Sequence, residues 1–192
     1  MSSPEGRAGA GGSRASLRDV ARDAIARGVR EGREPRPDPR EFPPALREPG
    51  ASFVTLRHRG ELRGCTGTLV PALPLVCDVA RNAWRSAFHD PRFTPLGEGE
   101  LALLEVSVTV LSALETLCAA SEDELLSALR PGVDGLVLVE EDGRAATFLP
   151  AVWEGLPEPR EFLERLRAKA GLAPGYWSPT LRFRRYTASD AG

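Results

Sequence analysis

The chain has 192 residues, of which 42% are hydrophobic and 27% charged, and its formal net charge at pH 7 is −2. These values fit a soluble globular domain with a sizeable core, and the slightly acidic balance disfavours a protein that binds nucleic acid through bulk positive charge. No apolar run approaches the roughly eighteen residues that a membrane span requires, so no membrane association is expected.

The first fifty residues divide into a tail, a helix and a proline-rich loop. Residues 1–15 have the composition of a disordered segment. Ser16 and Asp19 are spaced as a capping box, and the apolar residues after them repeat at helical spacing as far as Gly32, which predicts an amphipathic helix. Residues 33–50 contain six prolines, too many for a regular element, so a long tethered loop is expected.

A hairpin, a second helix and a strand follow. Residues 52–57 alternate as a strand, and residues 62–70 return after a turn. An apolar helical face runs through residues 76–88 and ends before Pro91, because proline disfavours helical geometry in its predecessor. Residues 104–111 alternate valine with serine and threonine, which is typical of a half-buried strand.

The remaining residues predict a short helix, a hairpin, a longer helix and a final strand, over 121–129, 135–149, 160–170 and 181–186. Three arginines on the final strand are interpreted as protection of a sheet edge, and residues 188–192 are expected to form a C-terminal tail. Helices and hairpins mix without a βαβ rhythm, which favours an α+β fold with a mainly antiparallel sheet and flanking helices. Residues 16–187 are expected to form one domain.

The predicted hairpin carries a thiol between two glycines, in the run Arg63-Gly64-Cys65-Thr66-Gly67. Glycine weakens a strand, so this run indicates a backbone that another chain segment or a ligand approaches closely. A thiol nucleophile needs a lowered pKa, which nearby guanidinium groups provide, and Arg63 lies two residues from Cys65 on the same strand face. The alternative is a small buried thiol without a chemical role. No histidine base is evident, which weighs against catalysis by Cys65.

A second candidate is the turn Asp90-Pro91-Arg92-Phe93. Aspartate before proline initiates turns, and its carboxylate can pair with Arg92, so the turn is interpreted first as a rigid corner. The functional alternative joins Arg92 with Arg63 in a fork that binds a carboxylate or phosphate.

The remaining chemistry-bearing residues predict no metal site and no cofactor. Three cysteines form no C-x-x-C pair, and the two histidines, His58 and His89, show no ligand spacing. An odd number of cysteines indicates reduced thiols.

Residues 1–16 lack the apolar core of a secretory signal, so a cytoplasmic location is expected. Of 25 basic residues only Lys169 is lysine, which we attribute to a GC-rich bacterial genome.

Several runs, in this order, resemble the AMME-syndrome candidate (AMMECR) family, whose prokaryotic members are called AmmeMemoRadiSam system protein A. The resemblance covers roughly residues 16–187. The family commonly has isoleucine at Thr66, and many members have glutamine at Ala151. The matching runs are Phe53-Val54-Thr55-Leu56, Leu62-Arg63-Gly64-Cys65-Thr66-Gly67-Thr68, Asp78-Val79-Ala80-Arg81-Asn82-Ala83, Asp90-Pro91-Arg92-Phe93, Glu105-Val106-Ser107-Val108, Phe148-Leu149-Pro150, Val152-Trp153 and Lys169-Ala170-Gly171-Leu172.

This resemblance implies a two-lobed α+β fold, in which the larger lobe takes residues from both ends of the chain and the smaller lobe is inserted. It also implies association with a Memo-like protein, similar to extradiol dioxygenases, and with a radical SAM protein. The oligomeric state stays open.

The function expected from these observations is binding of a small polar or anionic ligand. The residues expected to contact it are Arg63, Gly64, Thr66, Gly67, Asn82, Asp90 and Arg92. Two alternatives stay open, a thiol-dependent enzyme with Cys65 as nucleophile and an adaptor that binds proteins without catalysis. A weaker one has the arginine-rich termini contacting RNA.

Overall fold

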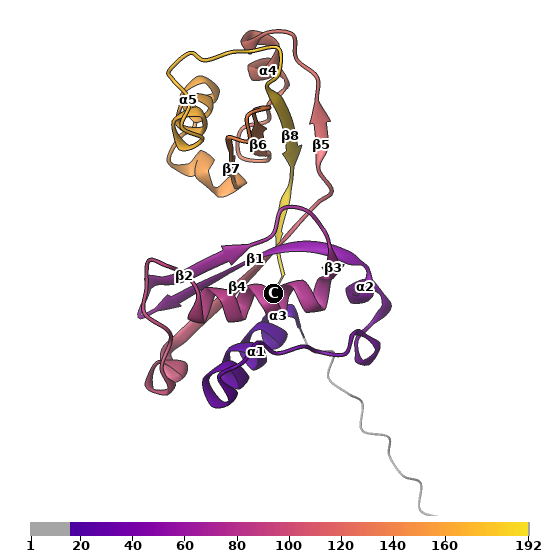
Figure 1. Cartoon of the computed structure of the whole chain (residues 1–192), viewed down its shortest axis with the longest axis vertical. Helices are drawn as coiled ribbons and strands as arrows, with labels where there is room; N and C mark the ends of the chain where they lie inside the picture. The colour runs from indigo at the N-terminus through magenta and orange to yellow at the C-terminus, as the bar shows by residue number, and fades with distance from the viewer. Residues whose placement is uncertain (1–15, 192) are drawn as a thin grey trace, which may run out of the picture.

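The computed structural model describes residues 16–191, so the predicted disorder of residues 1–15 lies outside the described part. Figure 1 shows two lobes stacked along the long axis of the molecule. The larger lobe contains the chain as far as β4 and also its last strand, and the smaller lobe is the stretch between them. Every strand pair within residues 16–191 is antiparallel. The α+β class is therefore confirmed.

The sheet of the larger lobe has the order β2-β1-β4-β9, with β3 paired to the start of β1. Its long strands alternate buried and exposed residues, because one face packs on helices and the other does not. The strands are β1 (Pro49–His58), β2 (Glu61–Gly67), β3 (Leu73–Pro74), β4 (Leu104–Leu111) and β9 (Ala188–Asp190).

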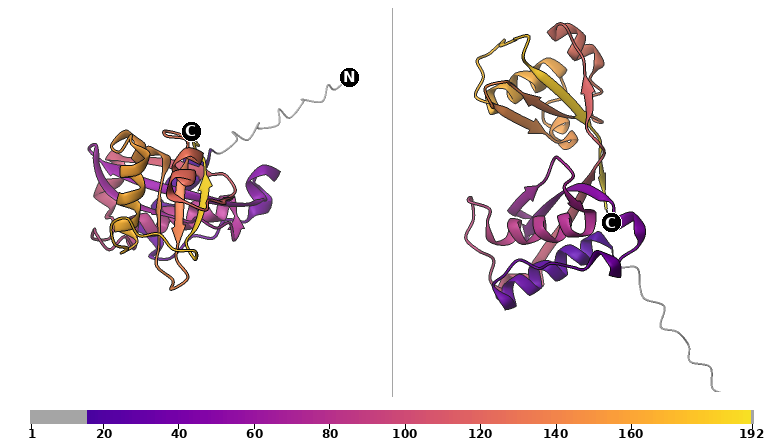
Figure 2. Two further views of the ribbon diagram at one scale, coloured as in Figure 1. Left: turned by 90° about the horizontal axis from the view of Figure 1, so that it is seen from above. Right: turned by 45° about the vertical axis from the view of Figure 1, so that its right-hand side comes forward.

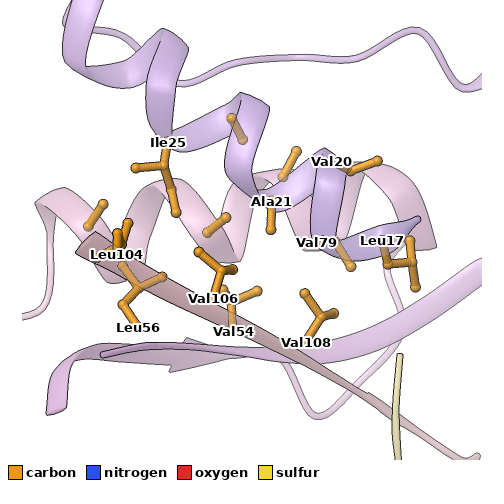
Figure 3. Close-up of a cluster of buried hydrophobic side chains, with 14 of the residues drawn as sticks. Leu17, Val20, Ala21, Ile25, Val54, Leu56, Val79, Leu104, Val106 and Val108 are labelled. Atoms are coloured by element: carbon orange, nitrogen blue, oxygen red, sulfur yellow. The ribbon is translucent and has the colours of Figure 1, made fainter. Parts of the chain in front are cut away.

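Two helices, α1 (Leu17–Glu31) and α3 (Leu75–Phe88), cover one face of this sheet. Ser16 and Asp19 form the predicted capping box, and Gly32 ends α1 in the left-handed conformation with a φ of 66°. The buried core between helices and sheet is drawn in Figure 3, and its labelled residues are Leu17, Val20, Ala21, Ile25, Val54, Leu56, Val79, Leu104, Val106 and Val108.

The smaller lobe has a four-stranded sheet of order β5-β8-β6-β7 and its own apolar core. Trp153 and Phe162 stack in that core, with ring centroids 3.8 Å apart. The elements are β5 (Glu115–Leu117), α4 (Glu122–Ala128), β6 (Gly135–Val139), β7 (Ala145–Phe148), η3 (Pro150–Glu154), α5 (Pro159–Lys169) and β8 (Arg182–Tyr186).

Two chain segments connect the lobes, one after β4 and one after β8, as the right view of Figure 2 shows. They are bonded to each other, since the N–H of Ser112 donates to the carbonyl of Thr187 at 2.9 Å. A small cluster buries Ala51 and Leu111 of the larger lobe against Val137 and Tyr186 of the smaller lobe. The face of the larger sheet that carries Ala51 and Leu111 is therefore the face turned toward the smaller lobe.

Two segments that the sequence predicts to lack regular structure contain helices or strands instead. The proline-rich segment is not free of regular structure, because it holds the turn η1 (Pro39–Glu41), the short helix α2 (Pro44–Arg47) and the start of β1. Proline at the first position of a helix is compatible with its fixed φ. The expected tail 188–192 also contains β9, which pairs with the end of β4.

None of the helices within residues 16–191 combines the length and apolar character of a membrane span.

Candidate functional site

The two glycines of β2 are explained by protein atoms that occupy the space beside them. A Cβ built on Gly64 would lie 2.1 Å from the carbonyl oxygen of Ser86 in α3. A Cβ on Gly67 would lie 2.3 Å from the ring of Phe53. Both distances are far shorter than any real carbon contact. The close approach that the sequence indicated is therefore present, and the approaching groups belong to this chain.

Cys65 lies on the face of the larger sheet that the helices leave uncovered. It pairs with Thr55 of β1, which in turn pairs with Ser107 of β4, and directly opposed residues share a face. The Sγ atom of Cys65 lies 3.4 Å from Oγ1 of Thr55. All three side chains are partly exposed. We call Cys65, Thr55 and Ser107 the polar row.

Neighbours of Cys65 along β2 face the other way. Gly64 pairs with Leu56, and Thr66 pairs with Val54, whose side chains lie in the core beneath the helices. Successive residues of a strand point to opposite faces. The prediction that Gly64 and Thr66 line one pocket together with Cys65 is therefore wrong.

Asp90 fixes the backbone of Cys65. Its side chain is 3% exposed, and its Oδ2 accepts the N–H of Cys65 at 2.9 Å. Three groups of Arg92 also donate to it, the backbone N–H at 3.1 Å, Nε at 2.9 Å and Nη2 at 2.7 Å. These hydrogen bonds, first those from Arg92 and then that from Cys65, hold the pKa of the Asp90 carboxyl far below its usual range. The geometry supports the rigid-corner interpretation of this turn.

Arg63 is bound by Glu100, in η2 (Glu98–Leu103). Its Nε donates to Oε1 at 2.7 Å and its Nη2 to Oε2 at 3.1 Å. This guanidinium, followed by the N–H of Gly97, lowers the pKa of Glu100. The Nη1 atom of Arg63 is buried and has no hydrogen-bond partner within residues 16–191. Glu100 is a site residue that the sequence analysis missed, because it lies 37 residues from Arg63 and no local pattern links the two.

The guanidiniums of Arg63 and Arg92 lie near the same ring, that of Phe93. Their Cζ atoms are 5.9 Å and 5.4 Å from its centroid. Each is already paired with its own carboxylate. The predicted two-arginine fork around one ligand is therefore wrong, although the structure does bring both arginines to the edge of β2.

On the face of the larger sheet that the helices cover, a buried network of hydrogen bonds connects α3 to the hairpin of β1 and β2. Nδ2 of Asn82 donates to the carbonyl of Ser52 at 3.0 Å, to Oδ2 of Asp78 at 3.0 Å and to Oγ1 of Thr68 at 3.1 Å. Oγ of Ser52 donates to Asp78 at 2.7 Å. Asn82 is fully buried. The prediction that Asn82 lines a ligand cleft is wrong, because its amide is used inside the fold.

Asp78 is buried without an ion pair among the described residues, and burial raises the pKa of its carboxyl. A carboxyl whose folded pKa is raised contributes stability at low pH and loses that contribution as pH rises through the folded pKa. We therefore expect the wild type to gain stability relative to Asp78→Asn when the pH falls from about 7 to about 4.5. Urea unfolding at several pH values measures this difference, with Asp190→Asn as an exposed control. A difference that is independent of pH contradicts the prediction.

Neither histidine faces the polar row. His58 lies on the same face of β1 as Leu56, opposite to Thr55. His89 follows α3 and packs on Trp84, with ring centroids 4.2 Å apart. Among residues 16–191 no three His, Cys, Asp or Glu side chains form a group that could hold a metal ion.

The sequence model of the AMMECR1 family matches residues 18–191, which include both lobes and every residue of the site. The chain belongs to the AMMECR1 family. A protein from Methanothermobacter thermautotrophicus is 36% identical over 180 residues, with 90% of each chain covered. Protein PF1979 from Pyrococcus furiosus is 39% identical, with 82% of this chain and 77% of the relative covered.

The fold of this AMMECR1 family member is also similar to a solved structure. The crystal structure of the uncharacterized protein PH0010 from Pyrococcus horikoshii matches with a TM-score of 0.82 and 32% identity. The match covers 91% of this chain and 88% of that one. None of these three names states an activity. The three relatives are archaeal, so they give no support to the bacterial origin expected from arginine usage.

Proposed function

We propose that the polar row and Arg92 bind a small polar or anionic ligand on the uncovered face of the larger sheet. The observation that carries this proposal is the position of Cys65. Cys65 is a partly exposed residue, and its thiol contacts the Thr55 hydroxyl on the face turned toward the smaller lobe. Arg92 lies beside it, because the Asp90 carboxylate accepts hydrogen bonds from both residues.

An unpaired hydrogen-bond donor of Arg92 near Cys65 suits an anionic ligand. Arg92 uses Nε and Nη2 on Asp90, and its side chain is 54% exposed, so its Nη1 is accessible. The Nη1 atom of Arg63 is buried and its other donors bind Glu100, so Arg92 alone of the two arginines offers an accessible donor. Guanidinium groups form strong, charge-assisted hydrogen bonds with carboxylates and phosphates. Asp90 acts here as a positioning residue, because its own oxygens are already occupied.

Binding is favoured over thiol chemistry because neither histidine of the chain lies beside the sulfur. A cysteine nucleophile is usually activated by a neighbouring base. The chain has only two histidines, and neither lies on the face that carries Cys65. Both arginines near the thiol are paired with carboxylates.

Protection of Cys65 from iodoacetamide tests the proposal, with sodium phosphate and sodium malonate as probes. At least one probe should slow the alkylation of Cys65 saturably and leave the exposed Cys118 unchanged. Arg92→Gln should raise the concentration required by roughly tenfold, because one charge-assisted contact is lost. Failure of both probes, or equal protection in Arg92→Gln, contradicts ligand binding here. Without probe, Cys65 labelling faster than Cys118 at neutral pH would favour the thiol enzyme instead.

Association with a Memo-like protein and a radical SAM protein stays a prediction that rests on the family resemblance. The adaptor alternative likewise stays a prediction. The RNA-binding alternative for the N-terminal tail concerns residues outside the described part.

A further inference from the structure

A hollow lies between α3 and the proline-rich segment. Its volume is about 420 Å³, within the range typical of small-molecule sites. Part of its lining is apolar, contributed by Pro35, Pro37, Leu73 and Cys77. Such a surface suits an apolar body of a few carbon atoms rather than a fully hydrated ion.

Two guanidiniums also line the hollow. The guanidinium groups of Arg36 and Arg81 form no ion pair or hydrogen bond with any residue of 16–191, whereas those of Arg40 and Arg33 nearby are each paired with a carboxylate. Glu34 lines the same hollow. With two cations and one anion, the lining carries one net positive charge.

The walls are held in place by identifiable contacts. Sγ of Cys77 donates to the carbonyl of Pro37 at 3.6 Å. Asp38 caps the following turn by accepting the N–H of Arg40 at 3.0 Å. Burial, with a smaller contribution from the charge of Asp38, raises the pKa of the Cys77 thiol, so this part of the lining stays uncharged at neutral pH.

We propose that this hollow binds a small organic anion, a carboxylate or phosphate carried on a short apolar body. The anionic head group pairs with Arg81 and Arg36, and the body contacts the prolines, Leu73 and Cys77. Cys77 and Arg81 are four residues apart on α3 and therefore lie on the same face of the helix. Asp78 and Asn82 of α3 bond instead to Ser52 of the sheet. The hollow is thus separate from the polar row.

Alkylation of Cys77 by N-ethylmaleimide in the full-length protein tests this inference. The probes are hexanoate, hexyl phosphate and hexanamide, which share a tail and differ in head group. At least one anion should slow the modification of Cys77 saturably, and hexanamide should require a concentration roughly tenfold higher or more. The anion that protects better identifies the preferred head group. Cys118 reports on an unrelated, exposed position and should be unaffected.

Two variants test whether Arg81 and Arg36 bind the anionic head group. Arg81→Gln and Arg36→Gln should each weaken protection by roughly tenfold. Arg85→Gln, at an exposed position one turn further along α3, is the matched control and should change nothing. If Arg81→Gln impairs folding, Arg36→Gln on the exposed segment still decides. The inference is overturned if neither anion protects Cys77, if hexanamide protects equally, or if the arginine variants behave like wild type. Because the reporter is Cys77, failure here leaves the proposal for Cys65 standing.

Discussion

Replacement of Gly64 by alanine is expected to destabilise the protein by about 3 kcal/mol or more. The new Cβ would lie 2.1 Å from the carbonyl oxygen of Ser86, and a backbone atom cannot rotate away as a side chain can. The hydroxyl of Ser86 also donates to the carbonyl of Val54 at 2.9 Å, which fixes this part of α3 to β1. Separation of helix and hairpin would therefore break this bond and open the core.

Urea unfolding of Gly64→Ala and of Gly99→Ala measures this effect. Gly99 is the matched control, because a Cβ there meets no atom within 4 Å and its φ is not positive. Its replacement should change the free energy of unfolding by less than about 0.5 kcal/mol. If Gly64→Ala loses less than about 1 kcal/mol, α3 and β2 are not packed as tightly as described.

The parts of the fold that the sequence predicted well are those governed by neighbours within a few residues. The capping box of Ser16 and Asp19 and the apolar face of α1 arise from spacings of three and four residues. The hairpin of β6 and β7 likewise follows from a tight turn between two short strands. Figure 3 shows the consequence, because the residues of that helical face are the ones that pack on the sheet.

Long-range pairing explains the errors. The sequence predicts a tail where β9 forms, because Ser189 of β9 pairs with Val110 of β4, which lies 79 residues earlier in the chain. The arginines of β8 were interpreted as edge protection, yet β8 lies between β5 and β6, and Arg185 binds Glu115 of β5 at 2.9 Å. Neither the partner of a strand nor its position in a sheet follows from its own composition.

The candidate site shows the same division. The sequence identified Cys65, Arg63 and the turn at Asp90 as one neighbourhood, and the structure does place them together. It could not reveal that Glu100 binds Arg63 or that Asp90 binds the N–H of Cys65, because both contacts join residues more than twenty positions apart.

The tripeptide Asp-Pro-Arg shows which properties of a turn depend on its own residues and which depend on the surrounding fold. Asp-Pro-Arg occurs twice, at Asp38-Pro39-Arg40 and at Asp90-Pro91-Arg92. In both, the aspartate accepts the backbone N–H and the guanidinium of the arginine two residues later. Asp38 has a 38% exposed side chain, whereas Asp90 is 3% exposed and also binds the N–H of Cys65. The local turn is thus encoded in the tripeptide, and its burial is not.

Asp90→Asn is therefore expected to lower the free energy of unfolding by about 2–3 kcal/mol near neutral pH. The amide loses the negative charge that Arg92 and the N–H of Cys65 share, and it places its own donors against theirs. Removal of this contact also frees the outward N–H of an edge strand. Asp38→Asn is the matched control and should have a much smaller effect, because water replaces its hydrogen bonds.

The pH dependence supplies a second, independent signature of the same contact. The folded pKa of Asp90 is lowered, so its contribution to stability is fully present above the unfolded pKa of about 3.9 and is lost as pH falls through the folded value. The stability difference between wild type and Asp90→Asn should accordingly be largest near pH 6 and shrink steadily from about pH 5 toward pH 2. Urea unfolding across this range measures it. A difference that persists undiminished in acid would mean that the Asp90 carboxylate does not hold the corner through its charge, and the anchoring of the Cys65 backbone would then need another cause.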